Sequence, residues 1–470
     1  MAAAPPGGRH SRAVGQLNVI RWHPKEIVLA LVSTPASLEQ ALPATLDNAE
    51  VLRIRNDFPV LDQLVNGRPL VYLDSGATSQ NPLSVIEAEQ EFYEQRNAAV
   101  HRGAHHLAVE ATEAFEDARQ TVADFIGADY SETIWTSNAT EGLNLISYTL
   151  STAGLWAAQG RGDAGLADLA LKPGDEIVVT EMEHHANLIP WQELAFRTGA
   201  TLRYIPIDDA GSLRMDQAGD IIGSRTKVLA FTHASNVLGT INPVRELVAL
   251  GRAVGALVVL DACQSAPHMV LDVKKLDVDF AVFSGHKMLA PTGIGVLYGK
   301  QELLDILPPF LTGGSMITTV TMERAEYLPA PQRFEAGTQR ISQAVALAAA
   351  ANYLTETGLD RIHRWESELG GRMVTGLESI PGIRVLGPAA GGERIGLAAF
   401  DVEGVHAHDV GQFLDSKGIA VRVGHHCAQP LHRRLGLTAT TRASAYLYNT
   451  TDDVDQFLDA VAGVRAYFRA

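Results

Sequence analysis

The chain contains the stretch Asp279-Phe280-Ala281-Val282-Phe283-Ser284-Gly285-His286-Lys287, in which an apolar run ends in a hydroxyl, a glycine, an imidazole and an amine. The apolar run predicts a strand that is buried on both faces. The glycine and the polar residues that follow predict a loop at the end of this strand. An amine beside groups that can bind phosphate is what a protein needs to hold an aldehyde cofactor. We therefore expect Lys287 to lie in a cofactor site.

Short apolar runs alternate with helical stretches upstream of this loop. Strands are expected at residues 134–136, 176–180, 227–231 and 257–260. This alternation predicts a mostly parallel sheet that is covered by helices on both faces, and therefore an α/β fold. Ligands of such sheets bind beyond the carboxyl ends of the strands, and polar residues follow each of these runs. We expect those polar residues to converge.

Changes in composition and in hydrophobic periodicity divide the chain into four segments. They are a weakly ordered N-terminal extension (residues 1–50), an N-terminal part of a small domain (51–72), a large domain that holds the sheet (73–325) and a C-terminal small α+β domain (326–470). An Ala/Gly-rich segment at 151–170 is interpreted as an insertion or a flexible surface loop. The other expected elements are helices at 82–98, 107–126 and 342–380 and strands at 395–401 and 419–423.

The composition is that of an ordinary globular protein and excludes some partners. The 470 residues carry a formal charge of −16, which argues against nonspecific binding to nucleic acid or to an anionic membrane surface. No apolar run reaches the roughly 20 residues that a membrane span needs. The run at residues 27–32 faintly resembles the core of an export signal, and we interpret it as part of the extension.

Two cysteines, Cys263 and Cys427, lie far apart in the sequence. They form neither a disulfide framework nor a cysteine-rich metal site, and a reducing, cytoplasmic setting suits them best. The histidines show no metal-binding pattern, and we expect no metal. Cys427 stands in the polar stretch Arg422-Val423-Gly424-His425-His426-Cys427-Ala428, which favours a mobile loop and a nucleophilic thiolate over a small buried hydrophobe. We expect a structural role for Cys263.

The neighbours of Lys287 support a cofactor site rather than a solvated lysine. A partly desolvated amine can be neutral and attack an aldehyde, and Ser284 and His286 can bind phosphate oxygens. Asp261, which ends a strand, is either a turn residue or a partner for the nitrogen of a pyridine ring, where it would strengthen the ring as an electron sink. Gln264 can donate a hydrogen bond to a phenolic oxygen on such a ring.

Three further sites complete the candidate chemistry. His184 and His185 are either surface and capping residues or a pair in which one imidazole stacks on the cofactor ring. The turn at residues 138–142 opens a helix, and helix N-termini bind phosphate. Arg442 precedes a strand-like run, and a guanidinium can bind the carboxylate of an amino acid through two hydrogen bonds.

Taken in order, these motifs resemble those of the SUF-type (group II) cysteine desulfurases, which belong to the class V aminotransferase-like, fold-type I enzymes that use pyridoxal 5'-phosphate (PLP). The resemblance covers residues 51–470 and implies the fold-type I architecture, with a large domain and a smaller α+β domain. The motifs are Asp74-Ser75-Gly76-Ala77-Thr78, Val100-His101-Arg102-Gly103, Glu183-His184-His185-Ala186-Asn187, Ser284-Gly285-His286-Lys287, Phe334-Glu335-Ala336-Gly337-Thr338 and the segment 422–428.

The resemblance implies a role for each matched residue around the PLP cofactor. Lys287 corresponds to the lysine that binds the cofactor aldehyde as a Schiff base. The other cofactor residues are His184 on the ring, Asp261 at the pyridine nitrogen, Gln264 at the phenolic oxygen, and Thr140, Ser284, His286 and, across a dimer interface, Thr338 at the phosphate.

The resemblance also implies a reaction in which Lys287, Cys427 and His184 are catalytic. Asn236 and Arg442 would bind the substrate carboxylate, and L-cysteine would be converted into L-alanine and a persulfide on Cys427. The sulfur would pass to an acceptor protein of the SufE or SufU type for iron–sulfur cluster assembly, and the enzyme would be a cytoplasmic homodimer. One alternative is a selenocysteine lyase that acts on L-selenocysteine. Another is a catalytically silent scaffold that docks sulfur-transfer proteins.

Overall fold

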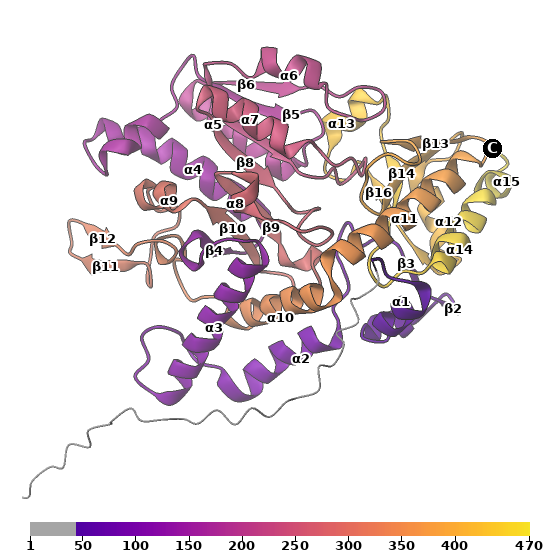
Figure 1. Cartoon of the computed structure of the whole chain (residues 1–470), viewed down its shortest axis with the longest axis horizontal. Helices are drawn as coiled ribbons and strands as arrows, with labels where there is room; N and C mark the ends of the chain where they lie inside the picture. The colour runs from indigo at the N-terminus through magenta and orange to yellow at the C-terminus, as the bar shows by residue number, and fades with distance from the viewer. Residues whose placement is uncertain (1–43) are drawn as a thin grey trace, which may run out of the picture. The chain divides into compact units, whose positions relative to one another are not determined.

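The strand that ends at Ser284 lies inside a seven-stranded sheet of the computed structural model, which describes residues 44–470. The strand order is β4-β10-β9-β8-β7-β5-β6, and only β10 runs against its neighbours. This confirms the predicted α/β fold with a mostly parallel sheet (Figure 1). The strands are β4 (Thr133–Thr136), β5 (Glu176–Thr180), β6 (Thr201–Ile205), β7 (Thr226–Thr232), β8 (Leu257–Asp261), β9 (Phe280–Ser284) and β10 (Gly295–Gly299).

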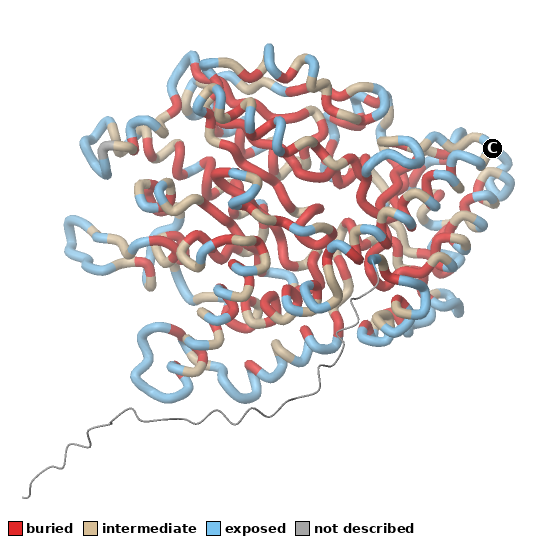
Figure 2. Tube along the Cα trace, in the orientation of Figure 1, coloured by how far each residue is buried: buried red, intermediate tan, exposed pale blue. Residues whose placement is uncertain are grey.

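Both faces of this sheet are covered, which explains why β9 is apolar throughout. Alternate residues of a strand point to opposite faces, so Phe280 and Val282 belong to one apolar cluster and Ala281 and Phe283 to another. Helices α4 (Ala139–Ala158) and α5 (Ile189–Thr198) contribute to the first cluster, and α3 (His106–Phe125), α7 (Val244–Val254) and α10 (Ile341–Thr357) to the second. Figure 2 shows the resulting buried centre.

A second, antiparallel sheet forms in the C-terminal part of the chain. Its order is β13-β14-β17-β16, with β13 (Ile383–Leu386), β14 (Leu397–Val402), β17 (Thr440–Ser444) and β16 (Arg422–Gly424). Helices α11 (Leu359–Glu378), α12 (Ala407–Asp415) and α14 (Thr451–Ala462) accompany it. An antiparallel sheet with separate helices is the α+β architecture expected for residues 326–470. The domain boundaries remain a prediction.

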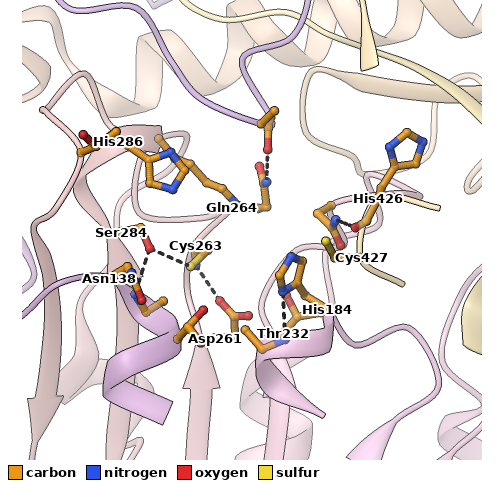
Figure 3. A pocket seen from close by; sticks show the side chains of 18 of the residues that line it. Asn138, His184, Thr232, Asp261, Cys263, Gln264, Ser284, His286, His426 and Cys427 are labelled. Atoms are coloured by element: carbon orange, nitrogen blue, oxygen red, sulfur yellow. Dashed lines mark hydrogen bonds between the residues drawn. The ribbon is translucent and has the colours of Figure 1, made fainter. Parts of the chain in front are cut away.

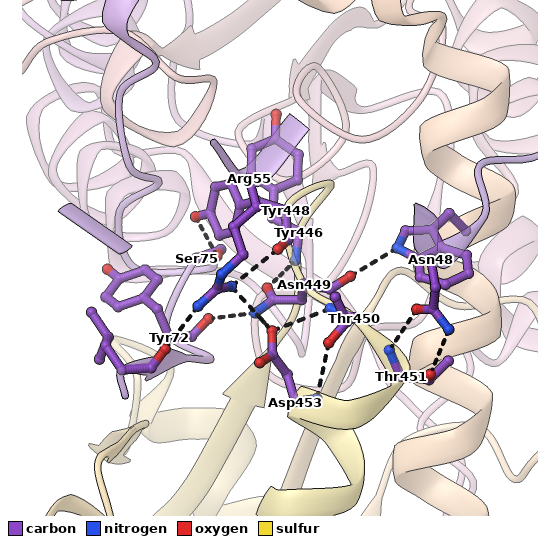
Figure 4. Close-up of polar contacts among 12 residues, drawn as sticks. Asn48, Arg55, Tyr72, Ser75, Tyr446, Tyr448, Asn449, Thr450, Thr451 and Asp453 are labelled. Atoms are coloured by element: carbon purple, nitrogen blue, oxygen red, sulfur yellow. Dashed lines mark hydrogen bonds and ion pairs between the residues drawn. The ribbon is translucent and has the colours of Figure 1, made fainter. Parts of the chain in front are cut away.

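The start of the described chain is bonded to its C-terminal part (Figure 4). Arg55, the last residue of α1 (Asn48–Arg55), donates to the carbonyl of Tyr448 and to the carboxylate of Asp453. Strand β3 (Val71–Tyr72) pairs in parallel with β15 (Ile419–Ala420). Helix α1 begins three residues before the expected boundary at 51, because Asp47 caps it. Residues 1–43 of the expected extension, with the apolar run at 27–32, lie outside the described residues.

The structure corrects two predicted elements. The interpretation of 151–170 as a flexible loop is wrong, since α4 continues to Ala158 and a 3₁₀ helix spans Ala164–Leu169. Alanine is the strongest helix former, and the Ala-rich composition here favours helix continuation. The single helix expected at 342–380 is instead two helices, α10 and α11. They are separated by Gly358, whose φ of 92° is a conformation that glycine adopts far more readily than other residues.

The remaining elements connect these layers. They are α2 (Leu83–Glu91) with a π-helical turn (Phe92–Arg96), α6 (Met215–Ile221), α8 (Val273–Leu276), α9 (Gln301–Ile306), α13 (Gln429–Arg434), α15 (Val464–Phe468), and the short strands β1 (Leu64–Val65), β2 (Arg68–Pro69), β11 (Ile317–Val320) and β12 (Ala325–Tyr327). Within residues 44–470, no helix has the length and apolar character to span a membrane.

A buried ion pair anchors the segment that leads to Thr338. The guanidinium of Arg119 on α3 donates to both carboxylate oxygens of Glu335, at 2.5 and 2.9 Å, and to the carbonyl of Thr133 on β4. The backbone N–H of Trp135 donates to the same carboxylate at 2.8 Å. Because the side chains of Arg119 and Glu335 are 0% and 4% exposed, neither charge can be solvated if its partner is removed.

We predict that Arg119→Met lowers the free energy of unfolding by about 3–5 kcal/mol, since it leaves the Glu335 carboxylate buried without a cation. The matched control is Arg372→Met, which breaks an ion pair with Asp455 whose side chains are 48% and 45% exposed. This control should cost less than about 1 kcal/mol. Urea unfolding followed by tryptophan fluorescence measures both, and equal losses in the two variants would contradict the prediction.

Candidate active site

A cavity of about 510 Å³ opens at the carboxyl ends of the parallel strands (Figure 3). The start of α4 and the ends of β7, β8 and β9 line it from the large sheet, and β17 and the loop after β16 line it from the small sheet. Ten of the eleven residues to which the resemblance assigns a role line this cavity: Thr140, His184, Asn236, Asp261, Gln264, Ser284, His286, Lys287, Cys427 and Arg442. The predicted convergence of the polar residues at the strand ends therefore occurs.

Lys287 lies in a short 3₁₀ turn, Gly285–Lys287, directly after β9. Its side chain is half-buried, and its amine makes no hydrogen bond or ion pair with any residue in 44–470. The strand before it is fully buried, so the backbone beneath the amine is held in place. An amine that faces a cavity without a protein partner is available to bind an aldehyde.

One end of the cavity offers the donors that a phosphate group needs. Ala139 N–H at the start of α4 donates to Ser284 Oγ at 2.9 Å, and Glu141 N–H donates to Asn138 Oδ1 at 3.0 Å. The N–H of Thr140, between them, has no partner among the described residues. A free N–H at the start of a 20-residue helix favours an anion. Ser284 accepts a hydrogen bond and keeps its own O–H for donation.

His286 stands at the same end of the cavity. Its Nδ1 lies 3.3 Å from Thr78 Oγ1. Burial and the charge of Lys287 lower the pKa of His286 to about 4, so the imidazole is neutral at neutral pH. His286 can therefore donate a hydrogen bond to a phosphate, but it does not add a positive charge.

The middle of the cavity fits a pyridine ring that carries a proton on its nitrogen. Asp261 is 4% exposed and accepts from Cys263 N–H at 3.0 Å, yet no cation among the described residues pairs with it. A buried carboxylate without a cation is costly, and a protonated ring nitrogen would supply the missing charge. Gln264 Nε2 donates to the Gly76 carbonyl at 2.8 Å and retains a second N–H, whereas its Oε1 is buried without a partner.

His184 lies beside Asp261, where the turn after β5 fixes its ring. Its Nδ1 accepts from Ala186 N–H at 3.0 Å. Burial and the charge of Lys287 lower the pKa of His184 below its usual value, so the ring is neutral and suited to stacking on an aromatic ligand. The donor set as a whole fits each part of PLP that the sequence predicts it to hold.

The carboxylate of Glu183, the residue before His184, supports the site from outside the cavity lining, and the sequence pattern assigned it no role. It accepts hydrogen bonds from Thr180 Oγ1, Asn187 Nδ2 and Thr232 N–H at 2.5, 2.6 and 3.1 Å. Burial, with a further contribution from the charge of Asp261, raises the pKa of Glu183 to about 8. Glu183 thus joins the ends of β5 and β7 beneath the cavity. Its position within the Glu183–Asn187 motif was the one feature of the sequence that could have pointed to this role.

Arg442 forms the opposite wall of the cavity. It is buried, its Nη1 donates to the Asn236 carbonyl at 2.8 Å, and its Nε is buried without a partner. Burial lowers the pKa of Arg442 to about 10, so the guanidinium is charged at neutral pH and can bind a carboxylate. Asn236 Nδ2 donates to the His426 carbonyl at 2.7 Å, which ties this residue to the cysteine loop as well.

Two charged residues near Arg442 were missed by sequence reasoning. Asp74 lies between two guanidinium groups, 2.9 Å from Arg422 Nη2 and 3.5 Å from Arg442 Nη2. The three residues come from distant parts of the chain, and only their presence in the motifs at 74–78 and 422–428 could have pointed to them. Asp74 orients Arg442, and Arg422 lines the cavity beside Cys427.

The exposed Cys427 is carried by the loop between β16 and α13. Its backbone φ is 56° and that of His426 is 49°, so two consecutive residues other than glycine adopt the left-handed conformation. Cys263, the other cysteine, lies on the cavity floor with its Sγ 3.9 Å from Ser284 Oγ. Burial and Asp261 raise the pKa of the Cys263 thiol well above its usual value, so Cys263 stays protonated.

Thr338 is the one predicted residue that lies elsewhere. It lines a smaller hollow with Trp135, Glu141 and Arg340. Within one chain it is therefore not part of the cavity that holds Lys287. Residues 44–470 contain no group of three or more histidine, cysteine, aspartate or glutamate side chains arranged to hold a metal ion.

Comparison with known proteins agrees with this geometry. The sequence profile of the family described as Aminotransferase class-V matches residues 71–457. A probable cysteine desulfurase 2 of Mycobacterium leprae (strain TN) is 54% identical over 425 residues, which are 90% of this chain and 99% of that protein. Among solved structures, the apo cysteine desulfurase from Thermococcus onnurineus NA1 has a TM-score of 0.80 and 40% identity and covers 88% of this chain and 98% of its own. The cysteine desulfurase CsdA from Escherichia coli has a TM-score of 0.79 and 36% identity, with coverage of 89% and 98%.

The family match spans most of the chain, and the relatives are matched over nearly their whole length. Both agree with the α/β fold and its mostly parallel central sheet. The chain belongs to the class-V aminotransferase family, together with the cysteine desulfurases that it matches.

Proposed function

We propose that this protein is a PLP-dependent cysteine desulfurase, which converts L-cysteine into L-alanine and leaves the sulfur atom as a persulfide on Cys427. The observation that carries the proposal is that one cavity is lined by an amine without a protein partner, a buried guanidinium and an exposed thiol. The first suits an aldehyde cofactor, the second suits an amino-acid carboxylate, and the third is a sulfur nucleophile.

The residues around the cavity would hold PLP at its different parts. Bound PLP acts as an electron sink that stabilises negative charge at the Cα of an amino acid. Lys287 holds the cofactor, Asp261 keeps its ring nitrogen protonated, and His184 stacks on the ring. Gln264 donates to the phenolic oxygen, and the phosphate is bound by Thr140, Ser284 and His286.

The substrate is oriented by its carboxylate, which binds Arg442 beside Asn236. With L-cysteine in the cavity, the free amine of Lys287 would be the base that removes the proton from Cα. The Cys427 thiolate then attacks the substrate sulfur. A sulfur–sulfur bond forms while the bond between Cβ and sulfur breaks, and the electron pair of the broken bond stays on the substrate carbon. That carbon takes up a proton and becomes the methyl group of alanine, and a proton returned to Cα by the Lys287 ammonium completes the product.

We also propose a sulfur acceptor, a pathway, a desulfurase group and an oligomeric state for this protein. Cys427 is exposed, so its persulfide can be reached by an acceptor protein, which we infer to be of the SufE or SufU type in a cytoplasmic pathway of iron–sulfur cluster assembly. The short segment 425–428 between β16 and α13 favours group II (SUF-type) over desulfurases with a longer cysteine loop. A homodimer would bring Thr338 of one chain to the phosphate site of the other.

The function is tested by adding L-cysteine and a thiol reductant to the purified holoenzyme and measuring alanine and sulfide. Equal amounts of the two products are expected, and Lys287→Ala should form neither at a significant rate. Near-normal turnover by Lys287→Ala would refute the role of that lysine. A rate on L-selenocysteine far above that on L-cysteine, with and without candidate acceptors, would instead identify a selenocysteine lyase.

We predict that Cys427→Ala keeps the bound cofactor but loses sulfide release, because the cavity residues that contact PLP are unchanged while the sulfur nucleophile is gone. The visible absorbance of the cofactor and the sulfide yield measure the two effects separately. Cys263→Ala is the matched control, since the protonated Cys263 thiol takes no part in sulfur transfer. Full sulfide release by Cys427→Ala would refute the persulfide mechanism.

We predict that Thr338→Ala binds PLP about tenfold more weakly, the effect of losing roughly one hydrogen bond to a charged group. The protein should sediment with the mass of two chains. Equilibrium dialysis of PLP measures the affinity, and Thr321→Ala, a substitution in the exposed β11–β12 turn, serves as a control. A wild-type protein that sediments as a single chain, or a Thr338→Ala variant that binds PLP as tightly as the wild type, would exclude the shared phosphate site.

A further inference from the structure

The backbone around Cys427 adopts a conformation that its own residues do not favour. Left-handed backbone costs residues other than glycine roughly 1–2 kcal/mol each, and both His426 and Cys427 adopt it. Such conformations persist only where the surrounding structure holds them. The contacts that hold this loop therefore decide where the Cys427 thiol lies.

One residue holds the loop at Cys427 itself and two residues beyond it. The backbone N–H of His185 donates to the Cys427 carbonyl at 2.7 Å, and the ring Nε2 of the same residue accepts from Gln429 N–H at 3.1 Å. His185 begins the 3₁₀ turn that follows His184, at the carboxyl end of β5. It thus connects the end of the large sheet to residues 427 and 429.

The ring contact also gives a hydrogen-bond acceptor to the first backbone N–H of helix α13. Gln429 is the first residue of this helix, Pro430 has no N–H, and the N-cap residue Ala428 makes no side-chain cap. The Gln429 N–H would otherwise be without a partner, as first-turn N–H groups are. His185 therefore caps α13 from a distant part of the chain.

The protonation state of His185 suits an acceptor. Burial and the nearby His425 lower the pKa of His185, and the two ring centroids are 5.8 Å apart. A neutral imidazole has one ring nitrogen with a free lone pair, and the contact with Gln429 requires this nitrogen to be Nε2. His184 is the other titratable ring that faces His185, at 6.4 Å.

The other contacts of the loop hold a different part of it. Asn236 binds the His426 carbonyl, and His426 Nε2 lies 2.9 Å from Thr440 Oγ1. Residues 427–429 otherwise make hydrogen bonds only within residues 425–432, as far as the described chain shows. His185 is thus their one hydrogen-bonded connection to the rest of the fold.

We propose that His185 is a positioning residue whose ring Nε2 fixes the Cys427 thiol for attack on the substrate sulfur. This inference rests on the proposed function, which makes Cys427 the nucleophile. The ring itself does not line the cavity, so it acts through the backbone of residues 427–429. Every residue type except proline could make the backbone N–H contact, and only the ring contact is specific to histidine.

Four variants of the cofactor-bound enzyme test this role. His185→Phe keeps a ring but loses the acceptor, and His185→Gln offers an amide oxygen at about the reach of Nε2. His185→Asn has the same amide one methylene shorter, so it cannot reach Gln429. His408→Phe, at an exposed site on α12 where the ring makes no hydrogen bond among the described residues, controls for the substitution itself.

Two readouts are measured: the rate of Cys427 alkylation by iodoacetamide, assigned by mass spectrometry, and kcat for alanine formation. Loss of one positioning contact should lower kcat about tenfold. His185→Phe and His185→Asn should therefore show this fall, together with alkylation that is several-fold faster because the loop is released. His185→Gln and His408→Phe should stay within about twofold of the wild type in both readouts, the spread expected when the acceptor is retained.

Two outcomes would overturn the proposal. The first is wild-type alkylation and kcat in His185→Asn and His185→Phe. The second is a loss in His185→Gln as large as in His185→Phe, because restoring the acceptor would then not restore the position of the thiol. If His185→Phe does not fold, the comparison of His185→Asn with His185→Gln decides alone. Absence of alanine formation by the wild type would refute the proposed function, while the alkylation rates would still test the position of the loop.

Discussion

The hydrogen bond from Ala139 N–H to Ser284 Oγ joins the start of α4 to the end of β9, and the rest of the cavity depends on this junction. It places a helix N-terminus beside the turn that carries Lys287. The approach is close enough to require a glycine on β10, since a Cβ at Gly295 would lie 2.6 Å from the Cα of Asn138. Thr140, the next residue of α4, lines the cavity, and its N–H has no partner among the described residues.

The cavity has its acidic and its basic side chains at different places, which suits a ligand that carries both positive and negative charges. Asp261 lines the cavity and Glu183 lies outside its lining, and burial together with the charge of Asp261 raises the pKa of Glu183. The two carboxyl groups therefore avoid being charged together at neutral pH, although Glu183 accepts three hydrogen bonds. His184, His286 and His426 are all held neutral by burial. The positive charge comes instead from Arg442, where a carboxylate would bind, while the Lys287 amine lies at a separate part of the cavity, where an aldehyde would bind.

The local sequence pattern predicted those site residues that directly follow a single strand. Lys287 and Asp261 follow apolar runs, and a parallel sheet brings such strand ends together. Strand β10 was not predicted, because its sequence Gly295–Gly299 begins and ends with glycine and lies after a loop. Its reversed direction depends on pairing with both β4 and β9. The roles of Asp74 and Arg422 could not be predicted, since each depends on a partner in a remote segment.

The nucleophile and the lysine come from different sheets, so their separation depends on the bonds that join the sheets. Arg394 is buried and donates to the carbonyls of Leu238, after β7, and of Leu397, on β14, at 3.1 and 2.6 Å. Arg442 and His185 make the same kind of connection from β17 and from the end of β5. In each case a donor on one side meets a backbone carbonyl on the other. Backbone carbonyls do not titrate, so these connections keep their geometry when the charges inside the cavity change during a reaction.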